Sequence, residues 1–512
     1  MEQNNNGNRR SRRDFLKVGA GALGTFSVAA SSLGATVGGP GGEDPRPNFV
    51  FFLAEGVRAD EFSASKIGGW DGNGLSAMGN KMISTPHMDR IFKEGITFQN
   101  AFVTYALCLP SRASILTGLY PHRTGAIDNR RRRIPDDIPT IADMLRAAGY
   151  EVAFFGKAHV HDLSKRNWET FFGVEAAGAD YYHPVLIESH RGVVKSRKEY
   201  HGYVDNLIVD RALKWLNQKR DKPFCLFVWF IAPHASFMRP RNLLKLYNGI
   251  RIPEPITFDD DLKGYPGKPM AFKETRIKIG TEFYNARSLE GLVKDHCAGV
   301  VNNDYNVGRI MGALEKTGTL DDTAIVLSGD HGFFLGEWRL FDKRFMHEPS
   351  IRVPLAIRYP RRIKGGLAPN EMALNIDIPP TILELAGVKT PDWTQWMQGR
   401  SLVPFMQGTL PPAWRKDWLY EYFEYPSPER VKPNRGVRTE RYKLIHYFLA
   451  PQEFELYDLQ EDPGELHNLY GDPRYAKLTQ DLLNRIDQLR KETGDVYTYQ
   501  MPNAYEFQQE KL

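Results

Sequence analysis

Four short runs of apolar, β-branched and aromatic residues stand out along this 512-residue chain, and helical patterns lie between them. The runs are residues 48–54, 151–155, 224–232 and 324–328. Their length and composition predict strands that are buried on both faces. Helical patterns occur at residues 138–148, 204–218 and 292–316. This alternation predicts an α/β fold in which a mixed, mostly parallel sheet is sandwiched by helices.

The pattern changes after about residue 407. Strand-like stretches at 418–423, 436–447 and 453–458 precede a polar helix at 475–493. Strands followed by a helix predict a small antiparallel sheet with a helix packed against it. We therefore expect a main domain at residues 47–408 and a C-terminal α+β subdomain at residues 409–512.

The first 35 residues have the composition of a targeting segment. Residues 11–17 read Ser-Arg-Arg-Asp-Phe-Leu-Lys, and a weakly apolar Gly/Ala-rich run follows to about Ala35. This resembles a twin-arginine export signal, with a disordered basic tail as the alternative. We expect a signal at 1–35, a linker at 36–46, and passage through the twin-arginine machinery to the periplasm or the cell exterior. The mature chain is expected to have no membrane segment, because no other stretch approaches 18 uninterrupted apolar residues.

Charge and cysteine content restrict the class of protein further. The chain has 67 Lys and Arg against 62 Asp and Glu, a net charge of +5, which is too small to indicate a nucleic-acid partner. Its three cysteines are Cys108, Cys225 and Cys297, too few for a disulfide framework. Cys225 and Cys297 lie in predicted core elements and are expected to be small buried residues.

Each predicted strand is followed by charged or imidazole side chains. The carboxyl ends of parallel strands meet at one edge of a sheet, where ligands bind in open α/β folds. The sequence therefore predicts a single ionic site at this edge. The residues that it would contain are Glu55, Lys157, His159, His234, Asp330 and His331.

Cys108 lies in the motif Cys108-Leu109-Pro110-Ser111-Arg112. Pro110 and Ser111 suit the first turn of a helix that Gly118 would end. Cys108 would then lie just before a helix N-terminus, where unpaired N–H groups favour an anion and Arg112 adds a positive charge. A catalytic thiolate would also be stabilised there.

Residues 108–118, Cys-Leu-Pro-Ser-Arg-Ala-Ser-Ile-Leu-Thr-Gly, resemble the signature of the formylglycine-dependent (type I) sulfatases of the alkaline phosphatase superfamily. The resemblance extends to residues 85–90, 120–125, 350–354, 438–444 and 455–458. It implies an alkaline-phosphatase-like fold and oxidation of Cys108 to formylglycine by a formylglycine-generating enzyme. The hydrated aldehyde would supply the oxygen that attacks a sulfate ester.

The resemblance also implies two sets of site residues. A hard divalent cation is expected, Ca²⁺ first, while the nitrogen ligand of His331 leaves Mg²⁺ or another metal open. The implied catalytic residues are Cys108, Arg112, Lys157, His159, His234 and Lys343, and the implied metal ligands are Glu55, Cys108, Asp330 and His331.

Glu55-Gly56 departs from the family pattern, which has two adjacent aspartates at this position. Glu55 keeps one carboxylate with a longer reach, Gly56 offers none, and Asp60 is an alternative ligand. Two other functions therefore remain: a phosphonate monoester or phosphodiester hydrolase of the same superfamily, and a metal-impaired glycan-binding relative. A cysteine hydrolase with an unmodified thiolate is the alternative to the modification of Cys108.

The resemblance assigns His234 as the acid for the leaving alcohol and His159 as the base, although the two roles are interchangeable at this stage. His122, His161 and His347 are expected to be structural, and Glu337 and Asp342 to orient other groups. The expected substrate is a sulfated carbohydrate, with N-acetylglucosamine-6-sulfate as one candidate. Segments 60–80 and 235–290 are expected to form substrate loops.

Overall fold

The computed structural model describes residues 46–62, 83–130, 132–258, 267–281, 287–389 and 392–499. The predicted export signal, residues 36–45 of the predicted linker and residues 63–80 of the first predicted substrate loop lie outside the described residues.

Nine strands of the described residues form one mixed sheet in the order β2-β10-β9-β1-β8-β4-β5-β6-β7. The four predicted strands are β9, β1, β8 and β4, which are adjacent and parallel at its centre. Antiparallel strands complete both edges, so the predicted mixed, mostly parallel sheet is confirmed. The strands are β1 (Asn48–Ala54), β2 (Ile96–Thr97), β4 (Glu151–Lys157), β5 (Thr170–Val174), β6 (Val185–His190), β7 (Val193–Glu199), β8 (Phe224–Trp229), β9 (Thr323–Gly329) and β10 (Leu355–Arg358).

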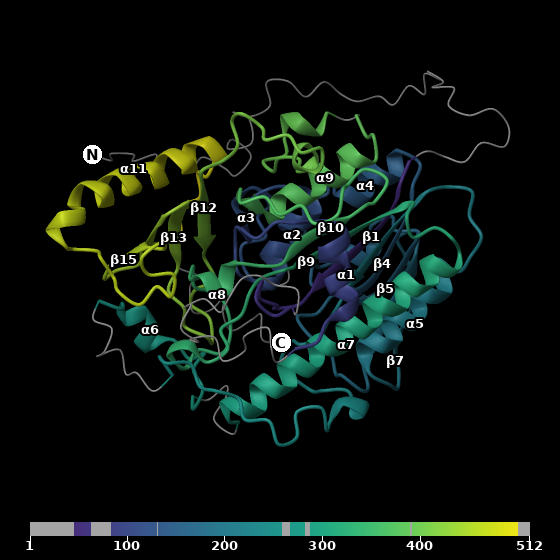
Figure 1. Cartoon of the computed structure of the whole chain (residues 1–512), viewed down its shortest axis with the longest axis horizontal. Coiled ribbons are helices and arrows are strands. Elements are labelled where there is room, and N and C mark those ends of the chain that lie inside the picture. Colours follow the sequence, from purple (N-terminus) through teal and green to yellow (C-terminus); the bar gives the residue numbers. More distant parts are fainter. Residues whose placement is uncertain are drawn as a thin grey trace, which may run out of the picture. The chain divides into compact units, whose positions relative to one another are not determined.

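Helices cover both faces of this sheet (Figure 1). Because side chains of a strand alternate between faces, β1 contributes to two cores. Val50, Phe52 and Ala54 pack with α1 (Pro86–Glu94), α5 (Val204–Leu216) and α7 (Leu289–Lys316). Phe49, Phe51 and Leu53 pack with α2 (Cys108–Thr117), α4 (Ile141–Ala147) and α9 (Ile378–Leu385). A strand buried on both sides explains the uninterrupted apolar run in the sequence.

The C-terminal part forms the predicted antiparallel sheet with one helix, drawn in yellow in Figure 1. Helix α11 (Ala476–Thr493) buries Leu482, Ile486 and Leu489 in the same core that holds Phe49 and α2. The stretch 436–447, expected as one strand, is a hairpin, because Thr439 Oγ1 accepts the N–H groups of Arg441 and Tyr442 at the turn. The strands are β12 (Asp417–Tyr422), β13 (Asn434–Thr439), β14 (Tyr442–Tyr447) and β15 (Glu453–Asp458).

Several short elements complete the described structure. Two of them, β3 (Ala101–Phe102) and β11 (Ala373–Leu374), pair in parallel as a separate sheet. The short α-helices are α3 (Pro121–Thr124), α6 (Met270–Glu274), α8 (Glu348–Ile351) and α10 (Val403–Met406). No described helix combines the length and the apolar character that crossing a bilayer requires.

Two of the element boundaries that differ from the prediction lie next to predicted site residues. Helix α2 begins at Cys108 itself, two residues before Pro110, and ends as predicted at Gly118, whose φ of 71° lies in the left-handed region. Strand β8 ends at Trp229 instead of Ala232. The Asp205 carboxylate accepts the N–H groups of Ile231 and Ala232 at 2.8 and 2.9 Å, which takes these residues out of the sheet.

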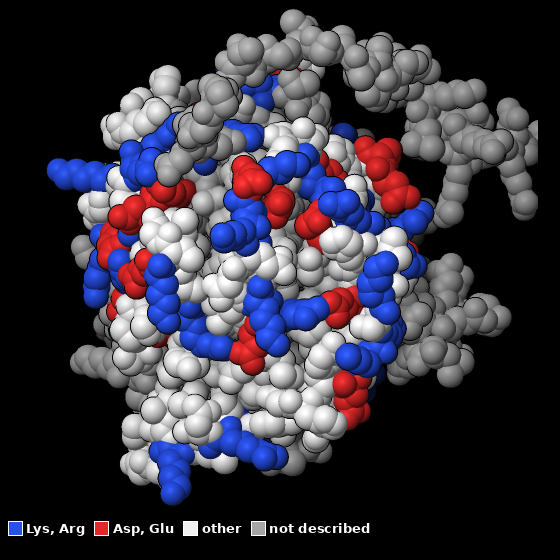
Figure 2. Space-filling model, turned by 90° about the vertical axis from the view of Figure 1, so that its right-hand side faces the viewer, with Lys and Arg blue, Asp and Glu red and all other residues white. Residues whose placement is uncertain are grey.

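Charges of both signs are distributed over the described residues of the face in Figure 2. Lys and Arg side chains are more widespread there than Asp and Glu side chains, which lie among them. This distribution agrees with the small net charge of +5.

Candidate active site

The carboxyl ends of β1, β4, β8 and β9 bring the predicted ionic residues to one place. Glu55 follows β1 directly, and Asp330 and His331 follow β9. One ligand atom from each of Glu55, Cys108, Asp330 and His331 lies within 4.8 Å of the others, and all four residues are buried. Residues far apart in the sequence therefore form one cluster at the N-terminus of α2.

Cys108 is the first residue of α2 and lies at the centre of this cluster. Its thiol donates to Glu55 Oε1 over 3.2 Å, and its sulfur is 3.3 Å from His331 Nε2. Burial and the Glu55 charge raise the pKa of the thiol. Three positive charges nevertheless hold this pKa well below its usual value of 9.0; they belong to Lys157, Lys343 and His331.

Arg112 lies one turn further along α2 and holds both carboxylates. Its Nε donates to Asp330 Oδ2 at 2.9 Å and its Nη2 to Glu55 Oε2 at 2.6 Å. Its Nη1 donates to the carbonyl oxygen of Lys157, and the guanidinium carbon lies 5.3 Å from the centre of the Trp229 ring. The fork of this fully buried side chain thus fixes the two acids relative to α2.

Glu55 accepts a second cation, since Lys157 Nζ lies 2.9 Å from Glu55 Oε2. Burial would raise the pKa of Glu55, but Lys157 and Arg112 lower it well below its usual value of 4.5. Asp330 behaves differently: burial and the neighbouring Glu55 charge raise its pKa, and its Oδ1 accepts the Gly56 N–H at 3.0 Å. Gly56 therefore contributes a backbone donor at the position where the sequence offers no side chain.

Two imidazoles face Glu55 in similar ways. His331 donates from Nδ1 to the Gly332 carbonyl at 2.8 Å, so its Nε2 faces the acids at 3.6 Å from Glu55 Oε1. Burial lowers the pKa of His331, but the charges of Asp330 and Cys108 raise it to about 10. His234 donates from Nδ1 to the Ala235 carbonyl at 2.8 Å and places Nε2 3.9 Å from Glu55 Oε1.

His159 and Lys343 complete the predicted set. His159 is 4% exposed, and its Nδ1 has no hydrogen-bond partner within the described part of the chain. Burial lowers its pKa to about 4, so the ring is neutral at neutral pH. Lys343 Nζ lies 3.3 Å from Asp342 Oδ1. Burial lowers the pKa of Lys343, but Asp342 and Cys108 outweigh it and raise this pKa.

Asp60 does not join the cluster, so the proposed substitute ligand is wrong. Both of its carboxylate oxygens accept from Arg58, at 2.9 and 2.8 Å. Arg58 also binds Glu337 at 2.6 Å. These three side chains form a separate buried ion cluster beyond the end of β1.

Two of the histidines that were expected to be structural lie in buried pairs. His122 Nδ1 is 2.7 Å from Glu421 Oε2, and its Nε2 is 3.0 Å from the Thr493 carbonyl. His347 Nε2 is 3.3 Å from Glu455 Oε2. Both pairs tie the main domain to the C-terminal sheet or its helix.

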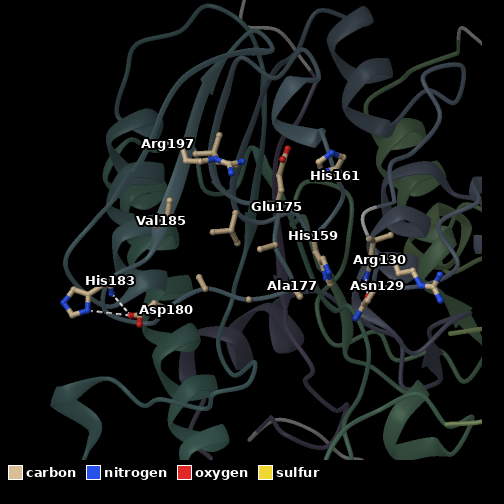
Figure 3. A pocket seen from close by; sticks show the side chains of 16 residues that line it. Asn129, Arg130, His159, His161, Glu175, Ala177, Asp180, His183, Val185 and Arg197 are labelled. Atoms are coloured by element: carbon tan, nitrogen blue, oxygen red, sulfur yellow. Dashed lines mark hydrogen bonds and ion pairs between the residues drawn. The ribbon is translucent and has the colours of Figure 1, made fainter. Parts of the chain in front are cut away.

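A cavity of about 610 Å³ opens beside His159 (Figure 3). Its walls come from the start of α2, the loop at 129–130, the loop after β4, the segment 174–183, and strands β6 and β7. These walls differ from the predicted substrate loops. The lining residues are Leu109, Asn129, Arg130, His159, His161, Val174, Glu175, Ala176, Ala177, Gly178, Ala179, Asp180, His183, Val185, Ile187 and Arg197.

Two residues that position the site were not predicted from the sequence. Asn129 Oδ1 accepts the N–H of Leu109 at 3.1 Å and so holds the first turn of α2. Asp205, from α5, binds the backbone at Ile231 and Ala232 and so shapes the loop that carries His234. Both act over a long sequence separation, which no local motif records.

The donor set fits a divalent metal. Glu55 and Asp330 supply carboxylate oxygens and His331 an imidazole nitrogen that already faces them, while the residue at 108 supplies a fourth atom. Carboxylates with one nitrogen donor suit Ca²⁺ less well than an all-oxygen set and also suit Mg²⁺ or Mn²⁺. Arg112 binds Asp330 Oδ2 and Glu55 Oε2, and Lys157 also binds Glu55 Oε2. Glu55 Oε1 is therefore left to face Cys108.

Comparison with known proteins decides the family. The sequence model of the sulfatase family matches residues 47–388, which is most of the chain. This chain belongs to the sulfatase family. It is therefore a hydrolase of sulfate esters, and its fold is that of the alkaline-phosphatase-like sulfatases. A second model, the C-terminal region of N-sulphoglucosamine sulphohydrolase, matches residues 336–492 of the sulfatase.

Individual relatives resemble the sulfatase over most of its length. An N-acetylglucosamine-6-O-sulfatase of Bacteroides thetaiotaomicron is 33% identical, over 91% of this chain and 90% of the relative. The multifunctional alkaline phosphatase superfamily protein PehA of Trinickia caryophylli is 29% identical, over 81% of this chain and 90% of the relative. A solved structure in complex with its substrate D-glucosamine-2-N,6-O-disulfate is 32% identical, with a TM-score of 0.78. The match covers 88% of this chain and 99% of that structure's chain.

Proposed function

We propose that this sulfatase is an exported enzyme that removes 6-O-sulfate from glucosamine units of sulfated carbohydrates, using a formylglycine made from Cys108 and a divalent metal. The observation that carries the proposal is the position of Cys108. It starts α2 and lies 3.2 Å from Glu55 and 3.3 Å from His331, within a buried cluster that also contains Asp330.

The substrate class is inferred from the relatives. One is an N-acetylglucosamine-6-O-sulfatase at 33% identity, and the other is a structure bound to a glucosamine that carries sulfate at N2 and O6. The chain covers nearly the whole length of both. The cavity beside His159 supports a sugar substrate, since its volume of about 610 Å³ lies in the range of small-molecule sites.

The residues at the site would hold the cofactors as follows. A metal would be held by Glu55, Asp330, His331 and the side chain at 108, and it would neutralise negative charge on the sulfate oxygens. A formylglycine at 108 would supply, as its hydrate, one hydroxyl to attack sulfur and a second whose deprotonation later releases sulfate. Its formation requires a formylglycine-generating enzyme as partner.

The chain's own residues would bind the sulfate and move the protons. Lys157 and Lys343 place positive charge beside residue 108, where it stabilises the charge that develops during transfer. Arg112 holds Glu55 and Asp330 in place.

His234 and His159 are the acid and base of this proposal. His234 Nε2, directed at Glu55, would donate a proton to the leaving alcohol oxygen. His159 would accept the proton of the second hydroxyl, which its pKa of about 4 permits because the ring is neutral at neutral pH.

Export is supported by the sequence alone. Residues 1–35 resemble a twin-arginine signal, which would take the enzyme to the periplasm or the cell exterior, where sulfated polymers occur. Its substrate would then be an extracellular glycan.

A phosphonate monoester or phosphodiester hydrolase is the second candidate. It is favoured by the single carboxylate at the end of β1, where Gly56 contributes only its N–H group. A multifunctional relative of the same superfamily is 29% identical to the chain. Parallel rates on an aryl sulfate and an aryl phosphodiester separate the two candidates.

The test is release of inorganic sulfate from a panel of sulfated mono- and oligosaccharides. The wild type should release sulfate from N-acetylglucosamine-6-sulfate, Cys108→Ala should be inactive, and Cys225→Ala should retain activity because Cys225 is a buried residue of β8. Activity that survives Cys108→Ala, or a preference for the phosphodiester, would refute the proposal.

A further inference from the structure

The cavity beside His159 has two arginines, three histidines and two acids on its walls. They come from separate segments, and Figure 3 shows Arg197 and Arg130 on different sides of the cavity, with Glu175 and His159 between them. The basic and imidazole residues are Arg130, His159, His161, His183 and Arg197, and the acids are Glu175 and Asp180.

Both acids of the cavity already accept hydrogen bonds from the protein. Glu175 Oε1 accepts the Ser164 N–H at 2.7 Å. Asp180 Oδ1 accepts the N–H groups of Tyr182 and His183 at 2.7 and 2.6 Å. Backbone N–H groups thus stabilise both carboxylates without a cation from the opposite wall.

Arg197 differs from these residues. It lies on β7 directly opposite Ile187 of β6, and both line the cavity. Among the residues that the structure describes, no ion pair or hydrogen bond engages its guanidinium. Arg130, across the cavity, lies near Asp128, with 3.8 Å between Nε and Oδ2. Among the described residues that line it, the cavity therefore presents one cation without an ion-pair partner, on a strand that is held in a sheet.

We propose that Arg197 binds a second anionic group of the substrate, a sulfate or a carboxylate, while the scissile sulfate ester lies at residue 108. The inference rests on the proposed function and deepens it: the preferred substrate carries two negative groups, one cleaved and one held. A guanidinium suits this role because its planar fork matches both sulfate and carboxylate oxygens.

The neighbouring residue on β7 provides a matched control. Lys198 lies on the opposite side of the strand from Arg197 because side chains alternate. It pairs with the buried Leu186, and its Nζ lies 5.2 Å from the centre of the Tyr200 ring. Lys198→Gln removes the same charge from the same strand without changing the cavity lining.

The experiment measures kcat/KM on three substrates. N-acetylglucosamine-6-sulfate has one anionic group, glucosamine-2-N,6-O-disulfate adds a sulfate, and N-acetylglucosamine-6-sulfate joined to a hexuronic acid adds a carboxylate. Arg197→Gln should reduce kcat/KM on at least one of the last two by about 1.5- to fivefold relative to the first, the range of an exposed ion pair. The substrate that responds identifies the source of the anion, and the effect should shrink as salt is raised.

Lys198→Gln should leave the ratios of the three rates unchanged. Equal effects of Arg197→Gln on all three substrates, or no effect on either substrate with two anions, would overturn the inference without affecting the proposed function. Binding of the same sugars to the Cys108→Ala chain, by calorimetry, gives the comparison without turnover. If no sugar is desulfated, the proposed function fails. The inference is then tested by the binding measurements alone, in which Arg197→Gln should weaken binding of a sugar with two anionic groups more than binding of N-acetylglucosamine-6-sulfate.

Discussion

The imidazole of His331 lies directly over Gly56. A Cβ atom added to Gly56 would be 3.3 Å from His331 Cε1, and the φ of Gly56 is +57°. The family pattern has a second acid at this position, whereas here the ring of a metal-ligand candidate occupies the adjoining space. A side chain at position 56 would therefore contact the imidazole of His331, so the glycine at 56 and the histidine at 331 fit together.

Gly56→Ala should displace His331 by a few tenths of an ångström and strain the backbone. We expect kcat/KM to fall by about tenfold or more, since small displacements of reacting groups are costly. Gly125→Ala is the control, because Gly125 has a φ of +72° with nothing within 4 Å of an added Cβ. It should cost about 1 kcal/mol of stability and little activity. Equal losses of activity in both variants would contradict this account.

Arg112→Lys should damage both stability and rate, because one ammonium cannot replace the two bonds to Asp330 and Glu55. Leaving buried carboxylates without this partner should cost about 3 kcal/mol of unfolding free energy. The rate should fall by about 10²-fold or more. Arg441→Lys, which alters a partly exposed pair with Asp458, should change denaturant unfolding by less than about 1 kcal/mol. Similar unfolding free energies for the two variants would argue against the role of Arg112.

The assignment of His234 as acid and His159 as base predicts different responses to the leaving group. A good leaving group needs no proton, so His234→Ala should lose more activity on a sugar sulfate than on 4-nitrophenyl sulfate. His159→Ala should affect both substrates alike, since it acts after the alcohol has left. Rates on the two esters check this, and the reverse pattern would exchange the roles.

The pH dependence of stability should reflect Asp304, a residue of α7 whose carboxylate binds the first turn of α1. Its carboxylate accepts the N–H groups of His87 and Met88 at 3.0 and 2.7 Å, and burial raises its pKa from 3.8 to about 7. Because the pKa of Asp304 is higher in the folded state, its protonation stabilises the fold. This contribution is complete below about pH 4 and is lost as the pH rises through 7. Relative to Asp304→Asn, the wild type should lose on the order of 2 kcal/mol between pH 4 and pH 8. Urea unfolding at both values measures this difference, and a constant difference would refute it.

The centre of the fold could be predicted because its strands are buried on both faces. Residues 48–54 carry an uninterrupted apolar run for this reason, and the predicted bounds equal those of β1. Strand β7 could not be found in the same way. It is an edge strand whose side chains are mostly exposed, so it reads Val-Val-Lys-Ser-Arg-Lys-Glu without an apolar run. The cavity wall that carries Arg197 was missed together with it.

The candidate site was predictable where residues end a strand or follow it directly. Glu55, Lys157 and Asp330 meet because the parallel strands that carry them are adjacent. The contacts of Asn129 with Leu109 and of Asp205 with Ile231 depend on tertiary packing between distant segments. Such contacts leave no periodicity or motif, so only the structure reveals them.

The mass of the peptide that contains residue 108 tests the central claim most directly. It should be measured on active enzyme produced together with a formylglycine-generating enzyme, alongside sulfate release by the same preparations. Our account predicts an aldehyde in place of the Cys108 thiol, with a specific activity that rises in proportion to the aldehyde fraction. Full activity in a preparation whose residue 108 remains an unmodified cysteine would contradict it.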